Sequence, residues 1–169
     1  MRAAVNPERR STLLWLLVAG AVWGLAVGVS RWRREPERPP APVWQRPVSE
    51  LTEVQQAHYA QVRAAILEAE RVRSAGAWPT TFLPGSVFRQ QRLTVNYVNE
   101  AAGLRWLVLF LEPDPRSPPE RAAPDDEHHT LADGTPLHVT VWTQPLSVPA
   151  PENVTAFPAA EGWVERVRR

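Results

Sequence analysis

The sequence predicts an α+β protein: an N-terminal transmembrane helix and a proline-rich linker, then one helix packed on a small antiparallel sheet of about three strands. Three observations support this fold class. Residues 11–30 form an uncharged apolar segment, and residues 49–75 repeat apolar side chains every three or four positions. Residues 93–98, 104–111 and 137–142 are short segments with the apolar pattern of strands. Such a sheet buries one face under the helix.

Residues 11–30 are the expected membrane span, because they contain neither a charged residue nor a proline. A helix of this length covers about 30 Å, the thickness of the hydrocarbon core of a bilayer. No Ala-x-Ala site follows, which favours a retained anchor over a cleaved signal peptide. The segment therefore predicts a single-pass protein of the bacterial inner (cytoplasmic) membrane. The flanking basic residues are Arg9, Arg10, Arg31, Arg33 and Arg34.

The prolines divide the rest of the chain. Residues 1–10 form a polar leader, and residues 31–48 form a linker whose prolines favour an extended backbone that holds the next domain away from the membrane. Residues 49–145 are the predicted small α+β domain, and residues 146–169 an extended, proline-containing tail with Trp163 as its docking residue. Arginines are nearly balanced across the membrane span, so they do not orient it. The common plan of anchored periplasmic modules favours a periplasmic domain.

The helix expected at residues 49–75 begins with Ser49 as its cap and ends before Gly76. His58 lies at the edge of its apolar face, where a histidine usually packs and forms hydrogen bonds. Tyr59 and Ile66 widen the face. Its main members are Leu51, Val54, His58, Val62, Ala65, Ala69 and Val72.

The three expected strands differ in how their side chains alternate. Residues 104–111 are apolar on nearly both faces, which is typical of a central strand. In residues 137–142, His138, Thr140 and Trp142 share one face, which we expect to meet a partner protein. Before the first strand, a turn-rich connection carries Trp78 and Phe82, whose rings are expected to cover the core.

Composition excludes several classes of function. The net charge of +1 gives no basic surface for nucleic acid. The chain has no cysteine, so it has no disulfide, thiolate metal site or cysteine nucleophile. It also lacks a Gly-x-Ser-x-Gly elbow, a phosphate-binding loop and a dinucleotide fingerprint. We therefore expect a protein that is not an enzyme.

The most polar segment is residues 124–134, which reads Pro-Asp-Asp-Glu-His-His-Thr-Leu-Ala-Asp-Gly. Together with the later His138, His128 and His129 provide three imidazoles near several carboxylates. Such a set suits Zn²⁺ without thiolates, although His-Glu-x-x-His spacing is absent. Two alternatives stay open: a solvated acidic loop with inert histidines, and a pH-responsive role for these histidines.

The order of an apolar helix, an alanine-rich helix, Gly76-Ala77-Trp78-Pro79 and a three-stranded meander resembles type IV pilins and pseudopilins. The sequence departs from them in having Arg10-Ser11-Thr12-Leu13 where the family has its processing site, and no glutamate in the apolar segment. A second resemblance, over residues 49–144, is to an uncharacterised bacterial family of single-pass membrane proteins found near metal-uptake transporters. It implies metal handling and no catalytic residue. The motifs are Glu127-His128-His129, Asp133-Gly134-Thr135, Leu137-His138-Val139 and Trp142.

Together these features predict a non-enzymatic, membrane-anchored accessory or interaction subunit of a bacterial membrane complex. Its expected partners are the lipid bilayer and one or more membrane proteins, with the anchor and the face around Trp142 as contact surfaces. The first alternative is a periplasmic zinc-handling module that uses the His/Asp loop, and the second is a pilin-like component.

Overall fold

The computed structural model describes residues 40–114, 116 and 127–168. The segment expected to span the membrane, residues 11–30, lies outside this part, as do the leader and most of the linker. Within the described residues, no helix combines the length and the apolar character needed to cross a bilayer. This finding contradicts the transmembrane element of the predicted fold class and the inner-membrane localisation. The α-helix that is described has charged, exposed side chains such as Glu68 and Arg71 along one face.

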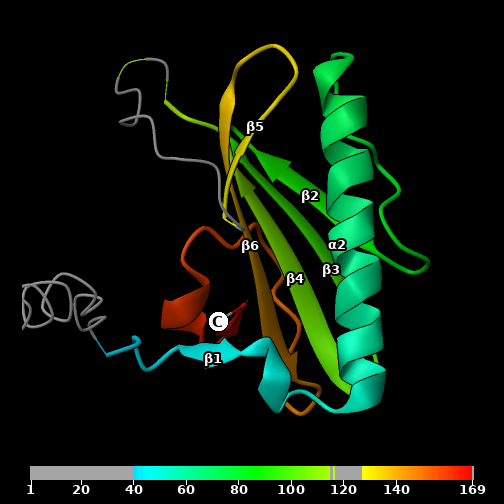
Figure 1. Cartoon of the computed structure of the whole chain (residues 1–169), viewed down its shortest axis with the longest axis vertical. Coiled ribbons are helices and arrows are strands. Elements are labelled where there is room, and N and C mark those ends of the chain that lie inside the picture. Colours follow the sequence, from blue (N-terminus) through cyan, green and yellow to red (C-terminus); the bar gives the residue numbers. More distant parts are fainter. Residues whose placement is uncertain (1–39, 115, 117–126, 169) are drawn as a thin grey trace, which may run out of the picture. The chain divides into compact units, whose positions relative to one another are not determined.

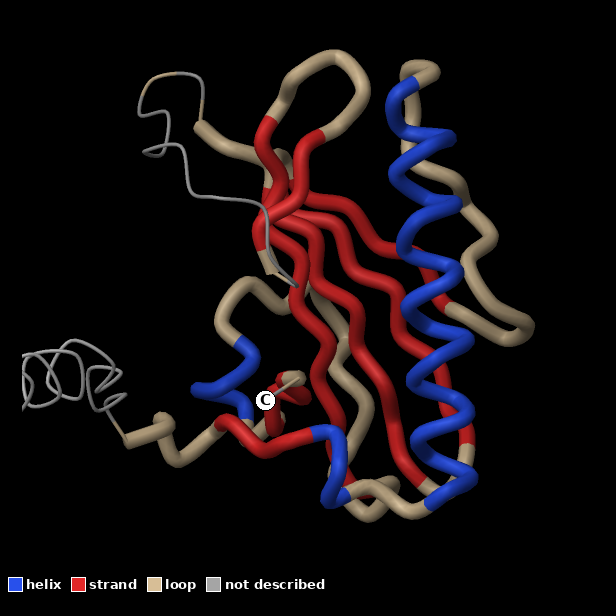
Figure 2. Tube along the Cα trace, viewed as in Figure 1, coloured by secondary structure: helices blue, strands red, loops and turns tan. Residues whose placement is uncertain are grey.

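The predicted sheet of about three strands is also wrong, because the structure has a mixed sheet of seven strands (Figures 1 and 2). The strand order is β1-β7-β6-β4-β3-β2, and β5 also pairs with β6. β1 and β7 are parallel, and the other pairs are antiparallel. The elements are β1 (Gln45–Pro47), η1 (Val48–Glu50), α2 (Glu53–Ser74), β2 (Val87–Gln91), β3 (Thr94–Ala101), β4 (Leu104–Leu111), β5 (His128–Thr130), β6 (Pro136–Pro145), η2 (Pro158–Glu161) and β7 (Val164–Val167).

The three predicted strands are confirmed as β3, β4 and β6, which are adjacent in the sheet. The structure adds β1, β2, β5 and β7, which have three to five residues each. Segments this short carry no usable alternation, and only their neighbours make them strands. β7 lies within the stretch expected to be an extended tail, and it pairs with both β6 and β1.

The helix α2 begins later than predicted. Its cap is Thr52 rather than Ser49: the Thr52 hydroxyl accepts a hydrogen bond from the Gln55 amide, and the Gln55 side chain accepts one from the Thr52 amide. Ser49 instead lies in the short turn η1. Val54 is 69% exposed, so the buried face is narrower than predicted. That face consists of Tyr59, Val62, Ile66 and Ala69.

α2 lies across one face of the sheet, and the main core forms between them (Figure 1). Trp106 and Phe110 of β4 are fully buried there. As predicted, the aromatic side chains of the connection before β2 cover this core. Trp78 packs on Phe110 with ring centres 4.6 Å apart, and Phe82 stacks on Tyr97 at 4.5 Å.

The opposite face of the sheet is covered by the segment that follows β6, so the expected contact surface around Trp142 is wrong. Trp142 is only 6% exposed and packs in a second core with Trp163, which docks as predicted. The Asn96 side chain donates to the Thr155 carbonyl at 3.1 Å and accepts from the Thr155 amide at 2.6 Å. These buried bonds hold the covering segment in place.

Candidate functional site

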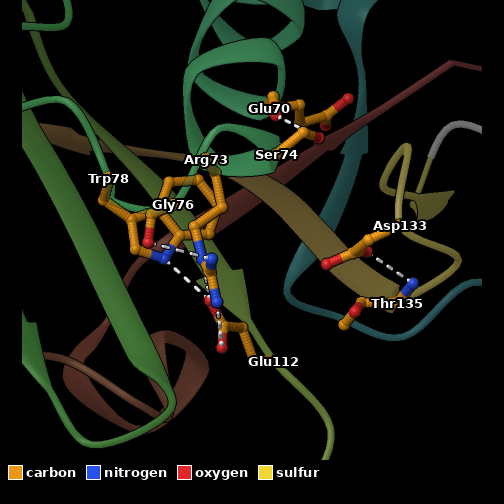
Figure 3. Close-up of polar contacts among 8 residues, drawn as sticks. All are labelled: Glu70, Arg73, Ser74, Gly76, Trp78, Glu112, Asp133 and Thr135. Atoms are coloured by element: carbon orange, nitrogen blue, oxygen red, sulfur yellow. Dashed lines mark hydrogen bonds and ion pairs between the residues drawn. The ribbon is translucent and has the colours of Figure 1, made fainter.

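Residues 124–126 of the expected polar segment lie outside the described part of the chain, and residues 127–134 belong to a hairpin of β5 and the first half of β6. Its turn is closed by a hydrogen bond from the Leu131 amide to the Thr135 carbonyl at 2.9 Å. Gly134 has a φ of 86°, a conformation that glycine adopts without strain. The Thr135 amide donates to Asp133 at 2.9 Å, which lowers the pKa of that carboxyl (Figure 3). Asp133 and Gly134 therefore lie in the tight turn that joins the two strands.

The hairpin divides the three candidate histidines between the two faces of the sheet. His128 lies directly opposite His138, and their ring centres are 5.2 Å apart. His129 lies on the other face, where its Nδ1 forms a hydrogen bond with Glu70 of α2. Within residues 40–114, 116 and 127–168, no group of three or more His, Asp or Glu side chains is arranged to hold a metal ion. The sheet thus brings two of the three imidazoles together.

The hairpin is fixed to the last turns of α2. The side chains of His129 and Glu70 are 10% and 14% exposed, so their contact is largely removed from water. Next to it, the Ala132 amide donates to the Ser74 hydroxyl at 3.3 Å, and that hydroxyl donates to the Glu70 carbonyl at 2.9 Å. Glu70 and Ser74 appear together on the helix in Figure 3. The position of β5 relative to the helix is therefore set by polar contacts.

A second polar cluster, of Arg73, Trp78 and Glu112, joins the end of α2 to the end of β4 (Figure 3). The Glu112 carboxylate accepts hydrogen bonds from Arg73 Nε at 2.7 Å and Trp78 Nε1 at 2.8 Å. The bonds from Arg73, and then from Trp78, hold the pKa of Glu112 below its usual value. Sequence reasoning missed this cluster, since its members are separated by up to 39 residues. It is a structural connection between the helix and the sheet.

His58 packs as the sequence predicted. Its ring meets Trp106 edge to face, with centres 4.9 Å apart, and the Asn99 amide nitrogen lies 3.3 Å from its Nε2. Burial lowers the pKa of His58, an effect that outweighs its hydrogen bonds to Gln61 and Asn99.

A small cavity lies between α2 and β6. On β6 it is lined by residues 139–141, which lie between the part that pairs with β5 and the part that pairs with β7. Its volume is about 40 Å³, and its lining includes Tyr59, Arg63, Glu127, Val141 and Arg166. Burial lowers the pKa of Arg166 there. Sites for small molecules usually measure about 300–1,000 Å³. This cavity has room for a few water molecules and excludes an organic substrate.

Three large apolar side chains are exposed on segments next to β1 and β7, and we call this surface the β1 edge. The residues are Val43, Trp44 and Phe157. Their exposed fractions are 87%, 44% and 78%. Trp44 directly precedes β1, and its carbonyl accepts a hydrogen bond from Glu165 of β7 at 2.8 Å. Phe157 precedes η2, which also contacts β7. The three residues therefore lie on segments that flank β7.

The chain matches no family model, no curated protein and no solved structure. The resemblances to pilins and to the transporter-associated family accordingly remain predictions.

Proposed function

We propose that this protein is a non-enzymatic interaction subunit, and that its β1 edge binds another protein. The observation that carries this proposal is the exposure of Val43, Trp44 and Phe157 on segments around a terminal strand. Tryptophan is among the residues that most often anchor protein interfaces. A terminal strand also presents backbone hydrogen-bonding groups on its outer side.

Two further features support an interaction role. The cavity beside β6, at about 40 Å³, is too small for an organic substrate. A net charge of +1 provides little attraction for nucleic acid, so we expect a protein partner. The face around Trp142 is not part of the proposal, because the covering segment buries it.

The experiment is site-specific photocrosslinking in living cells, with a photoreactive amino acid at position 44 or 157. We expect one discrete adduct from both positions, and we expect Phe157→Asp to reduce the adduct formed from position 44. Position 67 is the control, since Leu67 is 63% exposed and lies in the second half of α2. The mass of the adduct distinguishes a second copy of the chain from a different protein. Equal labelling from position 67, or no adduct from positions 44 and 157, would overturn the proposal.

A further inference from the structure

The register of the β5–β6 hairpin places two imidazoles at the closest kind of cross-strand position. The Val139 amide donates to the Glu127 carbonyl at 2.7 Å, so these two residues form a hydrogen-bonded pair. Pairs alternate along an antiparallel ladder, which makes His128 and His138 a non-hydrogen-bonded pair. In such pairs the Cα atoms are only about 4.5 Å apart and the side chains lie closest together.

The separation of the two rings is compatible with a shared metal ion. A Zn–N bond of about 2.0–2.1 Å places the ion about 3.2 Å from the centre of the imidazole ring. Two rings bound to one ion at a tetrahedral angle then have centres about 5.2 Å apart. The observed separation of the His128 and His138 rings is 5.2 Å. Their planes are inclined by 52°, so the rings are tilted rather than stacked.

We propose that His128 and His138 together chelate a divalent transition-metal ion. Imidazole ligands suit Zn²⁺, Ni²⁺ and Cu²⁺. Both side chains are half-buried, so solvent reaches the site. A pair of imidazoles supplies half the ligands of a four-ligand structural zinc site, so we expect weaker binding than at such a site.

His129 is not a ligand in this arrangement. Its Nδ1 forms a hydrogen bond with Glu70 of α2, on the face of the sheet opposite the pair. The candidate metal site is thus the pair of His128 and His138 rather than a set of three histidines.

The site is independent of the proposed interaction function. β5 pairs with residues 136–138 of β6, whereas β7, beside the β1 edge, pairs with residues 142 and 143 (Figure 1). A variant in the hairpin therefore leaves the β1 edge intact, and the failure of one proposal is distinguishable from the failure of the other.

The test is calorimetric titration of the full-length, EDTA-treated protein with zinc chloride. We expect one ion per chain, and at least a tenfold loss of affinity in both His128→Ala and His138→Ala. The double variant should bind at least as weakly as either single variant, because it retains neither imidazole of the pair. His128→Phe and His138→Phe keep the ring volume, and they serve where an alanine variant does not fold.

His129→Gln and His58→Gln are the matched controls. Together with His128 and His138, these two residues account for all four histidines of the chain. We expect both to retain the affinity for zinc. With Cu²⁺, electron paramagnetic resonance should show two coordinating nitrogens in the wild type and one in each single variant of the pair. The proposal is overturned if zinc does not bind at millimolar concentration, if the double variant binds as tightly as the wild type, or if His129→Gln costs as much as His128→Ala.

Discussion

Removing the Glu112 carboxylate tests whether its cluster with Arg73 and Trp78 holds the end of α2 on the sheet. The carboxylate accepts bonds from Arg73 at 2.7 and 3.2 Å and from Trp78 at 2.8 Å. A hydrogen bond to a charged group contributes about 1.5–3 kcal/mol. The Arg73 and Glu112 side chains are 24% and 17% exposed, and this residual hydration reduces the sum. We expect Glu112→Ala to lower the free energy of unfolding by about 3 kcal/mol.

The chain contains a matched control in the pair of Glu68 and Arg71. Arg71 donates to Glu68 at 2.8 and 2.6 Å, so the chemistry is the same. These side chains are 71% and 60% exposed, and surface ion pairs contribute little. In thermal unfolding followed by circular dichroism, Glu112→Ala should lower the Tm by about 10 °C. Glu68→Ala should leave it unchanged. Equal shifts in the two variants would refute the reasoning.

The same carboxylate predicts a dependence on pH. Hydrogen bonds from Arg73, and then from Trp78, hold the pKa of Glu112 below its usual value in the folded state. Its stabilisation is therefore complete above the unfolded pKa of about 4.3 and is lost as the pH falls through the lower, folded value. Denaturation by urea at several pH values should show a steeper loss below about pH 4.3 in the wild type than in Glu112→Ala.

Three further predictions concern other parts of the fold. Ala102 has a φ of 53°, a left-handed conformation that asparagine adopts more readily than alanine, so Ala102→Asn should raise the free energy of unfolding by about 1 kcal/mol. Ala57→Asn, on the exposed face of α2, should lower the free energy of unfolding, because asparagine is a poorer helix former than alanine. A change of the same sign in both variants would contradict this reasoning. Burial lowers the pKa of His58, so the folded state favours the neutral ring. As the pH falls below 6.5, the free energy of unfolding should therefore decrease more in the wild type than in His58→Phe. Parallel curves of unfolding free energy against pH would exclude this contribution of His58. Asn96→Leu removes both hydrogen bonds to the buried backbone of Thr155, which should lower the free energy of unfolding by about 2–4 kcal/mol. The variant should also be cleaved faster by thermolysin within residues 146–163. Unchanged cleavage would show that other contacts hold the covering segment.

Sequence reasoning succeeded where a pattern repeats within one segment. The apolar residues of α2, β3, β4 and β6 recur often enough to identify each element, and the docking of Trp163 followed from its aromatic character. It failed where a strand exists only through its neighbours. β1 and β7 have three and four residues, and each is defined by pairing with a segment about 120 residues away. Local propensity contains no information about such contacts.

The candidate metal ligands illustrate the same limit. The sequence identifies three histidines close together, but the pairing register decides which of them meet. A turn of residues 131–135 sets that register, and a shift by one residue would move His129 to the face of His138. Likewise, alternation correctly placed Thr140 and Trp142 on one face of β6, but it did not reveal that a proline-containing segment covers that face.

The parallel pairing of β1 with β7 has a consequence for how the protein is made. Gln45 is aligned with Glu165, and in the sheet order β1 has β7 as its neighbour. During translation, the ribosome must add about 120 further residues before the strand around Gln45 meets its partner. Trp44 therefore leaves the exit tunnel long before it has a folded neighbour, and it remains accessible to chaperones for most of the synthesis.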